Sequence, residues 1–233
     1  MQYRTLNKIY NIVKSSPNLF KATLSILKAA RGRYLIVRLD TTNFCNLKCK
    51  MCFFSIEKVE KAERMEIETF KQAADKLFSQ TRMLYLSCGA EPLVNRDFDK
   101  FVAISNGYGV PFTSFATNGM LMKENIVKSC IENKISEIVF SIDGNTPETM
   151  ESIRRGSKFK KVIENLTMTN NMVLKAKSKY PMIRVNFTLM KSNFHELEEF
   201  ISLLSLKIIV PSTFSVYYVL LTSFDILLIF QIP

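Results

Sequence analysis

The chain has 233 residues, enough for one substantial hydrophobic core, and 47% of them are hydrophobic, an ordinary share for a globular protein. With only seven Gly and seven Pro, the composition excludes a low-complexity chain. The 32 Lys and Arg against 21 Asp and Glu give a formal net charge of +11, and no acidic residue precedes Asp40.

The first predicted element is a basic helix within residues 5–30. Apolar residues recur there at helical spacing, on one helix or on two helices broken near Pro17: Leu6, Ile9, Tyr10, Val13, Phe20, Leu24 and Leu27. The lysines fall largely off this stripe. We expect either a helix packed on the domain with a solvated basic face, or an interfacial helix on anionic lipid or an acidic partner. No module interleaves aromatic and basic residues, so no nucleic acid is expected.

From residue 34 onward, strands and helices alternate. The predicted strands are Tyr34–Leu39, Met83–Leu86, Phe112–Ala116, Glu137–Ile142 and Ile183–Leu189. The predicted helices are Glu66–Gln80, Asp97–Asn106, Lys123–Asn133, Thr146–Ile153, Phe159–Val173 and His195–Leu206. Short polar loops between them indicate parallel βαβ units of an α/β fold, either a doubly wound sheet or an incomplete (β/α) barrel.

Polar and small residues gather where the predicted strands end. Thr41–Cys52 follows the first strand, Ser87–Pro92 the second and Thr117–Gly119 the third, while Ser141–Gly144 closes the fourth. Asn186 lies within the fifth strand. In parallel α/β folds, the chemistry collects at the carboxyl ends of the strands. The sequence therefore predicts an active site on this rim.

Three of the five cysteines lie in the first of these loops, Cys45-Asn-Leu-Lys-Cys49-Lys-Met-Cys52. Thiolates are soft ligands that bind zinc or iron–sulfur clusters. A closed zinc site needs four ligands, and the other candidates, Cys88, Cys130 and His195, lie far along the chain. A [4Fe–4S] cluster on three thiolates leaves one iron open to a small molecule. Zinc and iron–sulfur both remain candidates at this point.

The cysteine layout also bears on the cellular compartment. Three clustered and two isolated cysteines do not form the spread, even set of a disulfide framework, and the N-terminus lacks a signal-peptide pattern. We therefore expect a cytoplasmic protein. Membrane-surface contact, through the basic N-terminus or the apolar C-terminus, is the alternative. Away from the triad, we expect Cys88 to be a small core residue beside the site, Cys130 a buried helix residue, and His195 a non-catalytic helix start.

The cysteine loop resembles the C-x3-C-x2-C signature of the radical S-adenosylmethionine (radical SAM) superfamily. Ser87–Leu93 (SCGAEPL) is similar to its G-G-E-P segment with alanine at the second glycine, and Thr117–Gly119 resembles its T-N-G turn. Phe140–Gly144 (FSIDG) and Ile153–Gly156 (IRRG) resemble its S-I-D-G and I-R-x-G motifs. These motifs occur in the expected order between residues 34 and about 206. The resemblance implies a partial (β/α) barrel, TIM-barrel-like, with outer helices.

The resemblance also implies roles for individual residues. Cys45, Cys49 and Cys52 would ligate three irons of a [4Fe–4S] cluster, and S-adenosylmethionine would chelate the fourth. The implied S-adenosylmethionine contacts are Met51, Gly89, Ala90, Glu91, Asn118, Ser141, Asp143, Arg154 and Asn186.

These contacts differ in kind. Met51 would present its backbone to adenine, and the backbone carbonyls of Gly89–Glu91 would face the methionine ammonium. Ser141 and Asp143 would lie near the ribose hydroxyls or the methionine moiety, and Arg154 would pair with the carboxylate. Two residues have alternatives: Glu91 as a brace for its loop, and Arg154 on a solvated face.

The implied activity is reductive cleavage of S-adenosylmethionine to a 5′-deoxyadenosyl radical that abstracts hydrogen from an unknown substrate. The implied partner is an electron donor such as flavodoxin or ferredoxin. The S-I-D-G and I-R-x-G pattern is similar to the SPASM-type branch, which matures peptides, enzymes or peptide-derived cofactors. That branch usually has a cysteine-rich C-terminal domain, and no cysteine follows Cys130 here. The alternative function is a non-catalytic metal-binding or membrane-associated protein with an inactive core.

The last segment departs from this pattern. Residues 208–232 contain one charged residue, Asp225, where a sixth strand would be expected. One explanation is truncation or loss of the coding frame after about Leu206, and the other is a membrane or buried hydrophobic segment. We expect three parts: a basic helical extension at 1–33, a radical SAM core at 34–206, and an aberrant or hydrophobic tail at 207–233.

Overall fold

The computed structural model describes residues 12, 14–29, 32–55, 61–207 and 213–218. Its centre is a six-stranded sheet with the strand order β1-β3-β4-β5-β7-β8, in which all neighbouring strands pair in parallel. The strands are β1 (Leu35–Arg38), β3 (Thr81–Tyr85), β4 (Phe112–Thr117), β5 (Glu137–Ser141), β7 (Met182–Leu189) and β8 (Thr213–Tyr218). Because the first five follow one another along the chain and across the sheet, their carboxyl ends meet at one edge.

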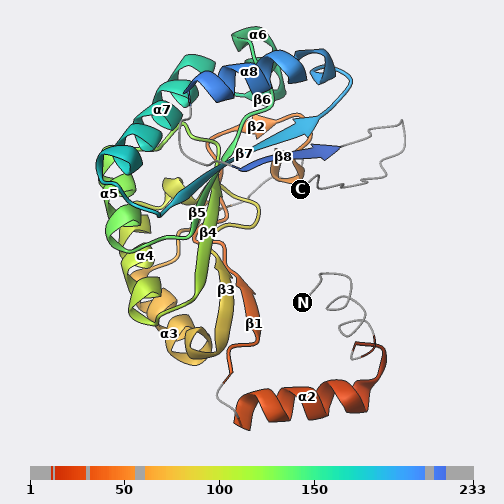
Figure 1. Ribbon diagram of the computed structural model, residues 1–233, viewed down its shortest axis with the longest axis vertical. Coiled ribbons are helices and arrows are strands. Elements are labelled where there is room, and N and C mark those ends of the chain that lie inside the picture. The colour runs from red at the N-terminus through yellow and green to blue at the C-terminus, as the bar shows by residue number, and fades with distance from the viewer. Residues whose placement is uncertain (1–11, 13, 30–31, 56–60, 208–212, 219–233) are drawn as a thin grey trace.

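Helices cover one face of the sheet. They are α3 (Ile67–Leu77), α4 (Phe98–Gly107), α5 (Glu124–Glu132), α6 (Pro147–Ile153), α7 (Phe159–Lys175) and α8 (Leu197–Lys207). Figure 1 shows α3, α4, α5 and α7 as an outer layer along one side of the curved sheet. The predicted α/β half-barrel with outer helices is confirmed, and the doubly wound alternative, which needs helices on both faces, is wrong.

The two faces of the sheet follow from the alternation of side chains along each strand. In β5, Ile138 and Phe140 are fully buried in the main core beneath the helices, whereas Ser141 lines a cavity on the other face. In β7, Val185 and Phe187 join the same core, and Asn186 alternates with them. The core is rich in phenylalanine, with Phe70 stacked on Phe101 at 4.5 Å between ring centroids. This packing fixes the strand register and therefore the edge where the loops meet.

A small antiparallel ribbon lies beside the main sheet. Its strands are β2 (Lys48–Cys49), inside the cysteine loop, and β6 (Arg154–Arg155), just after α6. In register, Lys48 faces Arg155 and Cys49 faces Arg154. No sequence pattern predicts this ribbon, because two-residue strands are too short to show a periodicity.

The C-terminal boundary differs from the expected one. Residues 213–218, within the predicted tail, form β8 and pair with β7 along six residues. The sequence TFSVYY is rich in β-branched and aromatic residues, which favour strands, and strands of a parallel sheet read as apolar runs rather than as alternating patterns. Residues 208–212 and 219–233 lie outside the described residues. Among the described helices, none combines the length and apolarity needed to span a bilayer.

The predicted N-terminal helix is present in part, as α2 (Pro17–Ala29). Proline begins this helix, a position where its missing N–H costs nothing. Phe20, which belongs to the predicted apolar stripe, is 45% exposed, and Leu19 and Ile26, which lie off that stripe, are 43% and 68% exposed. Figure 1 shows α2 apart from the outer helix layer. Residues 1–11 lie outside the described part of the chain.

Candidate metal-cluster and cofactor site

Three thiols converge on one cavity at the carboxyl edge of the sheet. Cys45, Cys49 and Cys52 line this cavity, whose volume is about 300 Å³. It is also lined by residues of the other strand-end motifs, namely Met51, Ser87, Cys88, Gly89, Ala90, Glu91, Thr117, Asn118, Ser141 and Arg154. Ten of the twelve residues predicted for the cluster and cofactor therefore share one cavity. A larger hollow of about 660 Å³, between residues 40–43 and 61–66, contains no thiol.

The cysteine loop is held by short-range contacts. The backbone N–H of Leu47 donates to Cys45 Sγ at 3.5 Å, and the N–H of Cys52 donates to the Cys49 carbonyl at 3.2 Å. The N–H of Lys50 donates to the Ile153 carbonyl at 2.9 Å, which fastens the loop to the end of α6. The loop is thus positioned by the fold as well as by its own turns.

Two thiols of the cysteine loop are affected by burial. Burial raises the pKa of Cys49 to about 11 and also raises the pKa of Cys45. Buried thiols are therefore protonated at neutral pH until a metal cation stabilises the thiolate. Within the described part of the chain, no three Cys, His, Asp or Glu side chains come close enough together to hold a single metal ion.

The loop after β3 is anchored by a residue that the sequence analysis missed. Asp40, directly after β1, accepts hydrogen bonds from the backbone N–H groups of Cys88, at 2.7 Å, and Gly89, at 3.2 Å. A Cβ atom at Gly89 would lie 2.0 Å from the ring of Phe54, so a larger residue here would displace the ring or the loop. A carboxylate directly after the predicted strand Tyr34–Leu39 was the available signal for Asp40. Cys88 is exposed, so its expected place in the core is wrong.

Glu91 is buried and its carboxylate holds two loops together. Its Oε1 accepts from Thr117 Oγ1 at 2.7 Å, and its Oε2 accepts from the Asn118 N–H at 2.7 Å. Oε1 also accepts from the N–H of Leu93 at 3.3 Å. Burial raises the pKa of Glu91 to about 7, against the opposing effect of these donors. The side chain acts as the brace that the sequence analysis gave as its alternative role.

Asn118 connects the turn after β4 to the cysteine loop. Its Nδ2 donates to Asn46 Oδ1 at 2.8 Å, and its Oδ1 accepts from the N–H of Met120 at 3.0 Å. Gly119, the next residue, has φ +78°, which lies in the left-handed region that favours glycine. Asn46 was not predicted as a site residue, because its partner is supplied by the fold.

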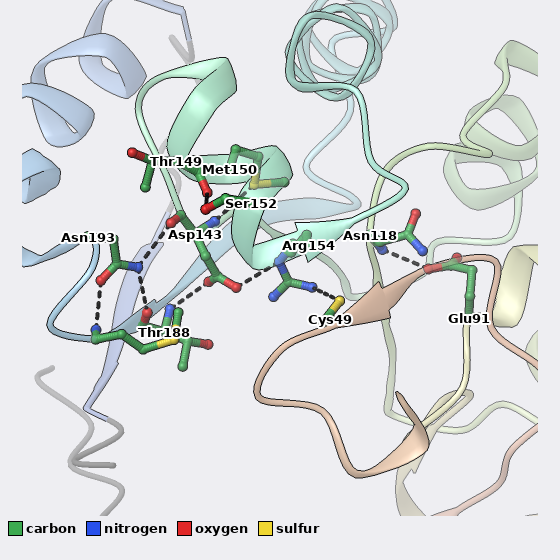
Figure 2. A network of polar contacts seen from close by, with 11 residues as sticks. Cys49, Glu91, Asn118, Asp143, Thr149, Met150, Ser152, Arg154, Thr188 and Asn193 are labelled. Atoms are coloured by element: carbon green, nitrogen blue, oxygen red, sulfur yellow. Dashed lines mark hydrogen bonds and ion pairs between the residues drawn. The ribbon is translucent and has the colours of Figure 1, made fainter. Parts of the chain in front are cut away.

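Arg154 and Asp143 form an ion pair at the edge of the cavity. Arg154 Nε lies 2.7 Å from Asp143 Oδ2, and the side chains are 11% and 0% exposed. Asp143 Oδ1 accepts from the N–H of Thr188 at 2.7 Å. Figure 2 shows Arg154 between Asp143 and Cys49, with the guanidinium directed at both. Arg154 is therefore not on a solvated face.

Two predicted cofactor contacts do not line the cavity. Asp143 is fully buried and its two oxygens face Arg154 and Thr188. Asn186 pairs in register with Ser141, and its Oδ1 has no hydrogen-bond partner among the described residues. Cys130 is buried in α5, as expected, and His195 is an exposed residue before α8.

The fold and the site together define a (β/α) half-barrel protein with a three-thiol cluster loop at the carboxyl ends of its strands. A sequence profile described as the radical SAM superfamily matches residues 39–204. This match covers most of the chain, and the chain belongs to the radical SAM superfamily.

Curated relatives agree with this assignment. The chain is 30% identical over 139 residues to 7,8-dihydro-6-hydroxymethylpterin dimethyltransferase of Methanocaldococcus jannaschii, covering 56% of this chain and 27% of that protein. It is 28% identical over 134 residues to GTP 3',8-cyclase of Alkaliphilus oremlandii (56% and 41%) and 25% identical over 167 residues to mycofactocin maturase MftC of Mycobacterium tuberculosis (71% and 40%). The chain thus spans less than half the length of each of these enzymes.

Solved structures show the same fold. The crystal structure of Streptococcus suis SuiB bound to S-adenosylmethionine matches with a TM-score of 0.63 at 16% identity, covering 93% of this chain and 51% of that chain. The radical S-adenosylmethionine methyltransferase TsrM from Kitasatospora setae, with cobalamin and a [4Fe–4S] cluster bound, matches with a TM-score of 0.61 at 12% identity, covering 79% and 37%.

The superfamily uses a [4Fe–4S] cluster and S-adenosylmethionine, and the residues present here fit both groups. Three soft donors come from the loop, which matches a cluster with one iron left for another ligand, and Cys88 adds a fourth thiol to the lining of the cavity. The glycine at 89 and the small alanine at 90 line the same cavity and let the backbone approach a bound molecule closely.

Proposed function

We propose that this protein is a radical SAM enzyme that binds its cluster through Cys45, Cys49 and Cys52 and reductively cleaves S-adenosylmethionine to abstract hydrogen from an as yet unidentified substrate. The observation that carries the proposal is the sharing of one cavity by the three thiols and the four strand-end motifs. When bound, the cluster and S-adenosylmethionine supply one-electron cleavage of the sulfonium and a 5′-deoxyadenosyl radical.

The residues of the chain would position these groups. The Gly89–Ala90 backbone would approach the methionine ammonium, with Glu91 fixing the loop from behind. Asn118 would keep the cysteine loop in register with the turn after β4. Ser141 and the backbone of Met51 line the same cavity and are our candidates for contacts to the nucleoside.

The named relatives support this general function rather than one substrate. By name, they are a pterin dimethyltransferase, a GTP cyclase and a mycofactocin maturase. Each covers a stretch of this chain between about half and three quarters of its length, and the profile match covers residues 39–204. The profile match at residues 39–204 includes the cysteine loop and the strand-end motifs.

The electron donor that we propose is an acidic one-electron carrier such as flavodoxin or ferredoxin. Lys48 and Arg155 are exposed and directly opposite each other in the β2–β6 ribbon, and Lys50 is also exposed. Like charges opposite each other in a ribbon are destabilising, so their arrangement is explained better by an acidic partner than by stability. None of the three is in an ion pair within the described part of the chain. This basic ribbon face lies on the back of the strand that carries Cys49.

Anaerobic reconstitution with iron and sulfide tests the proposed function. We expect a [4Fe–4S] spectrum, and formation of 5′-deoxyadenosine from S-adenosylmethionine when a reductant is added. Alanine at Cys45, Cys49 or Cys52 should abolish both signals. The matched control is Cys130→Ala, which removes a thiol buried in α5 away from the cavity and should keep both.

Two results would contradict the proposal. Stoichiometric zinc in place of iron would assign the loop to a structural metal. A cluster whose electron paramagnetic resonance spectrum does not change with S-adenosylmethionine, and which releases no 5′-deoxyadenosine, would leave a metal-binding protein without this activity.

A further inference from the structure

The β2–β6 ribbon sorts its side chains onto two faces. Cys49 is buried and Arg154, its cross-strand partner, is partly buried, while the neighbouring pair Lys48 and Arg155 is exposed. Partners in an antiparallel ribbon project to the same face, and successive residues alternate. One face therefore presents Cys49 together with Arg154 to the cavity, and the other presents cations to solvent.

Arg154 is held in one orientation by Asp143. The ion pair joins Nε to Oδ2 at 2.7 Å, and it uses the side of the guanidinium that faces away from Cys49 (Figure 2). Asp143 is itself fixed, because its Oδ1 accepts from the Thr188 N–H and its carbonyl accepts from Asn193 Nδ2 at 2.9 Å. A buried arginine with a rigid partner loses little conformational entropy when it makes a further contact.

The other side of the guanidinium faces a cluster ligand. Arg154 Nη1 donates to Cys49 Sγ at 3.9 Å, a contact between residues 105 positions apart in the sequence. An arginine side chain keeps its proton throughout the physiological pH range, so Arg154 is a cation at this position. Lys48, Lys50 and Arg155 lie near in sequence, but their exposure places them in water, where charges are strongly screened.

We infer that Arg154 is a positioning residue for the cluster: held by Asp143, it donates a charged hydrogen bond to the Cys49 thiolate and raises the reduction potential of the [4Fe–4S] cluster. The inference rests on the proposed function, because it needs the cluster on Cys49. Reduction adds one negative charge to the cluster and its thiolates. A fixed cation at one sulfur stabilises the reduced state more than the oxidised state, and hydrogen bonds to sulfur are among the factors that set these potentials.

The test is a mediated redox titration of the reconstituted protein, followed by electron paramagnetic resonance, without S-adenosylmethionine. Arg154→Gln alone leaves the buried Asp143 charge without its partner and risks misfolding. The double variant Asp143→Asn with Arg154→Gln removes both charges, and the asparagine oxygen still accepts from Thr188. We expect the equilibrium constant for reduction to fall about tenfold, a shift of about 59 mV to a more negative potential for one electron.

The matched control is Arg155→Gln, which removes one positive charge at the next residue but on the exposed face of the ribbon. Its potential should equal that of the wild type. An unchanged potential in the double variant, with full iron and sulfide content, overturns the inference. So does an equal shift in Arg155→Gln, since the effect would then come from net charge alone.

The remaining outcomes separate this inference from the proposed function. If the double variant binds S-adenosylmethionine more weakly but keeps the wild-type potential, Arg154 serves the methionine carboxylate instead and the inference is wrong. If the wild-type protein forms no [4Fe–4S] cluster, the proposed function fails and the inference fails with it.

Discussion

The Asn118 side chain donates a hydrogen bond of 2.8 Å to Asn46, across 72 positions of sequence, and so ties the turn after β4 to the cysteine loop. The same amide accepts from the N–H of Met120 at 3.0 Å. One side chain thus fixes its own turn and the loop that presents the three thiols. Loss of this side chain should therefore weaken metal retention as well as lower the stability of the fold.

Asn118→Ala should loosen the cysteine loop. Removal of the amide leaves the Met120 N–H and the Asn46 carbonyl without this partner, at a cost of about 1–2 kcal/mol in the free energy of unfolding. We expect iron release to an added chelator to be several-fold faster than in the wild type, as followed by absorbance. Asn106→Ala is the control, since the Asn106 side chain donates a weak hydrogen bond to Asn133 at 3.5 Å, away from the cysteine loop, and iron release should not change. Equal rates in Asn118→Ala and the wild type would show that the link does not hold the loop.

Glu91 should give the stability a pH dependence opposite to that of an ion-paired carboxylate. Its pKa is about 7 in the fold, because of burial, and 4.5 ordinarily. The stabilisation linked to this shift is complete below about pH 4.5 and is lost as the pH rises through about 7, a total of about 3 kcal/mol at most. Chemical denaturation of the cluster-free protein between pH 5 and pH 8 measures it.

Glu91→Gln isolates this contribution. The amide group of glutamine would face an N–H or hydroxyl donor, so the variant should be less stable than the wild type at pH 5. The difference in the free energy of unfolding between the variant and the wild type should become smaller towards pH 8, because only the wild type then carries a buried charge. Glu132→Gln, on the exposed surface of α5, is the control, and its free energy of unfolding should change with pH in the same way as that of the wild type. If this difference instead increases with pH, the three hydrogen-bond donors lower the pKa of Glu91 more than burial raises it.

Gly89→Ala should disturb the loop that faces the cavity. The added Cβ atom would meet the Phe54 ring at 2.0 Å, so the ring or the loop must move, at about 1–3 kcal/mol. We expect weaker binding of S-adenosylmethionine to the reconstituted protein, measured by calorimetry. Phe54→Leu should relieve the clash in the double variant. Gly107→Ala is the control, because a Cβ atom there meets nothing within 4 Å, and it should bind as the wild type does.

Charge reversal on the basic ribbon face should slow electron delivery. With Lys48→Glu and Lys50→Glu, we expect cluster reduction by an acidic flavodoxin to slow by tenfold or more at low ionic strength, and less at high salt. Stopped-flow absorbance measures this rate. Reduction by a small chemical reductant should be much less affected. Lys76→Glu with Lys175→Glu changes the net charge equally on the outer helices α3 and α7 and should leave the flavodoxin rate near that of the wild type. Equal slowing by both pairs would point to net charge rather than docking at the ribbon.

Much of the fold could be predicted because the strands and helices of parallel βαβ units each show a hydrophobic periodicity in their own residues. Ile183–Leu189 was expected as a strand and Met182–Leu189 forms one, since apolar residues at every second position mark the face beneath the helices. The strand 213–218 was missed for a related reason. It lies in the segment 208–232, whose largely apolar character is equally that of a membrane segment or of core strands, and the pairing of residues 213–218 with β7 decides between them for this stretch.

The sequence alone determined where the chemistry lies. The spacing of Cys45, Cys49 and Cys52, and the polar motifs at the strand ends, are local patterns, and the rule that parallel strands end at one edge brings them together. The tertiary structure decided what each side chain does there. Asp143 stays a predicted cofactor contact, and the structure adds its ion pair with Arg154, which lines the cavity. Such pairings join segments whose approach depends on the packing of the whole sheet, and no local pattern of residues encodes them.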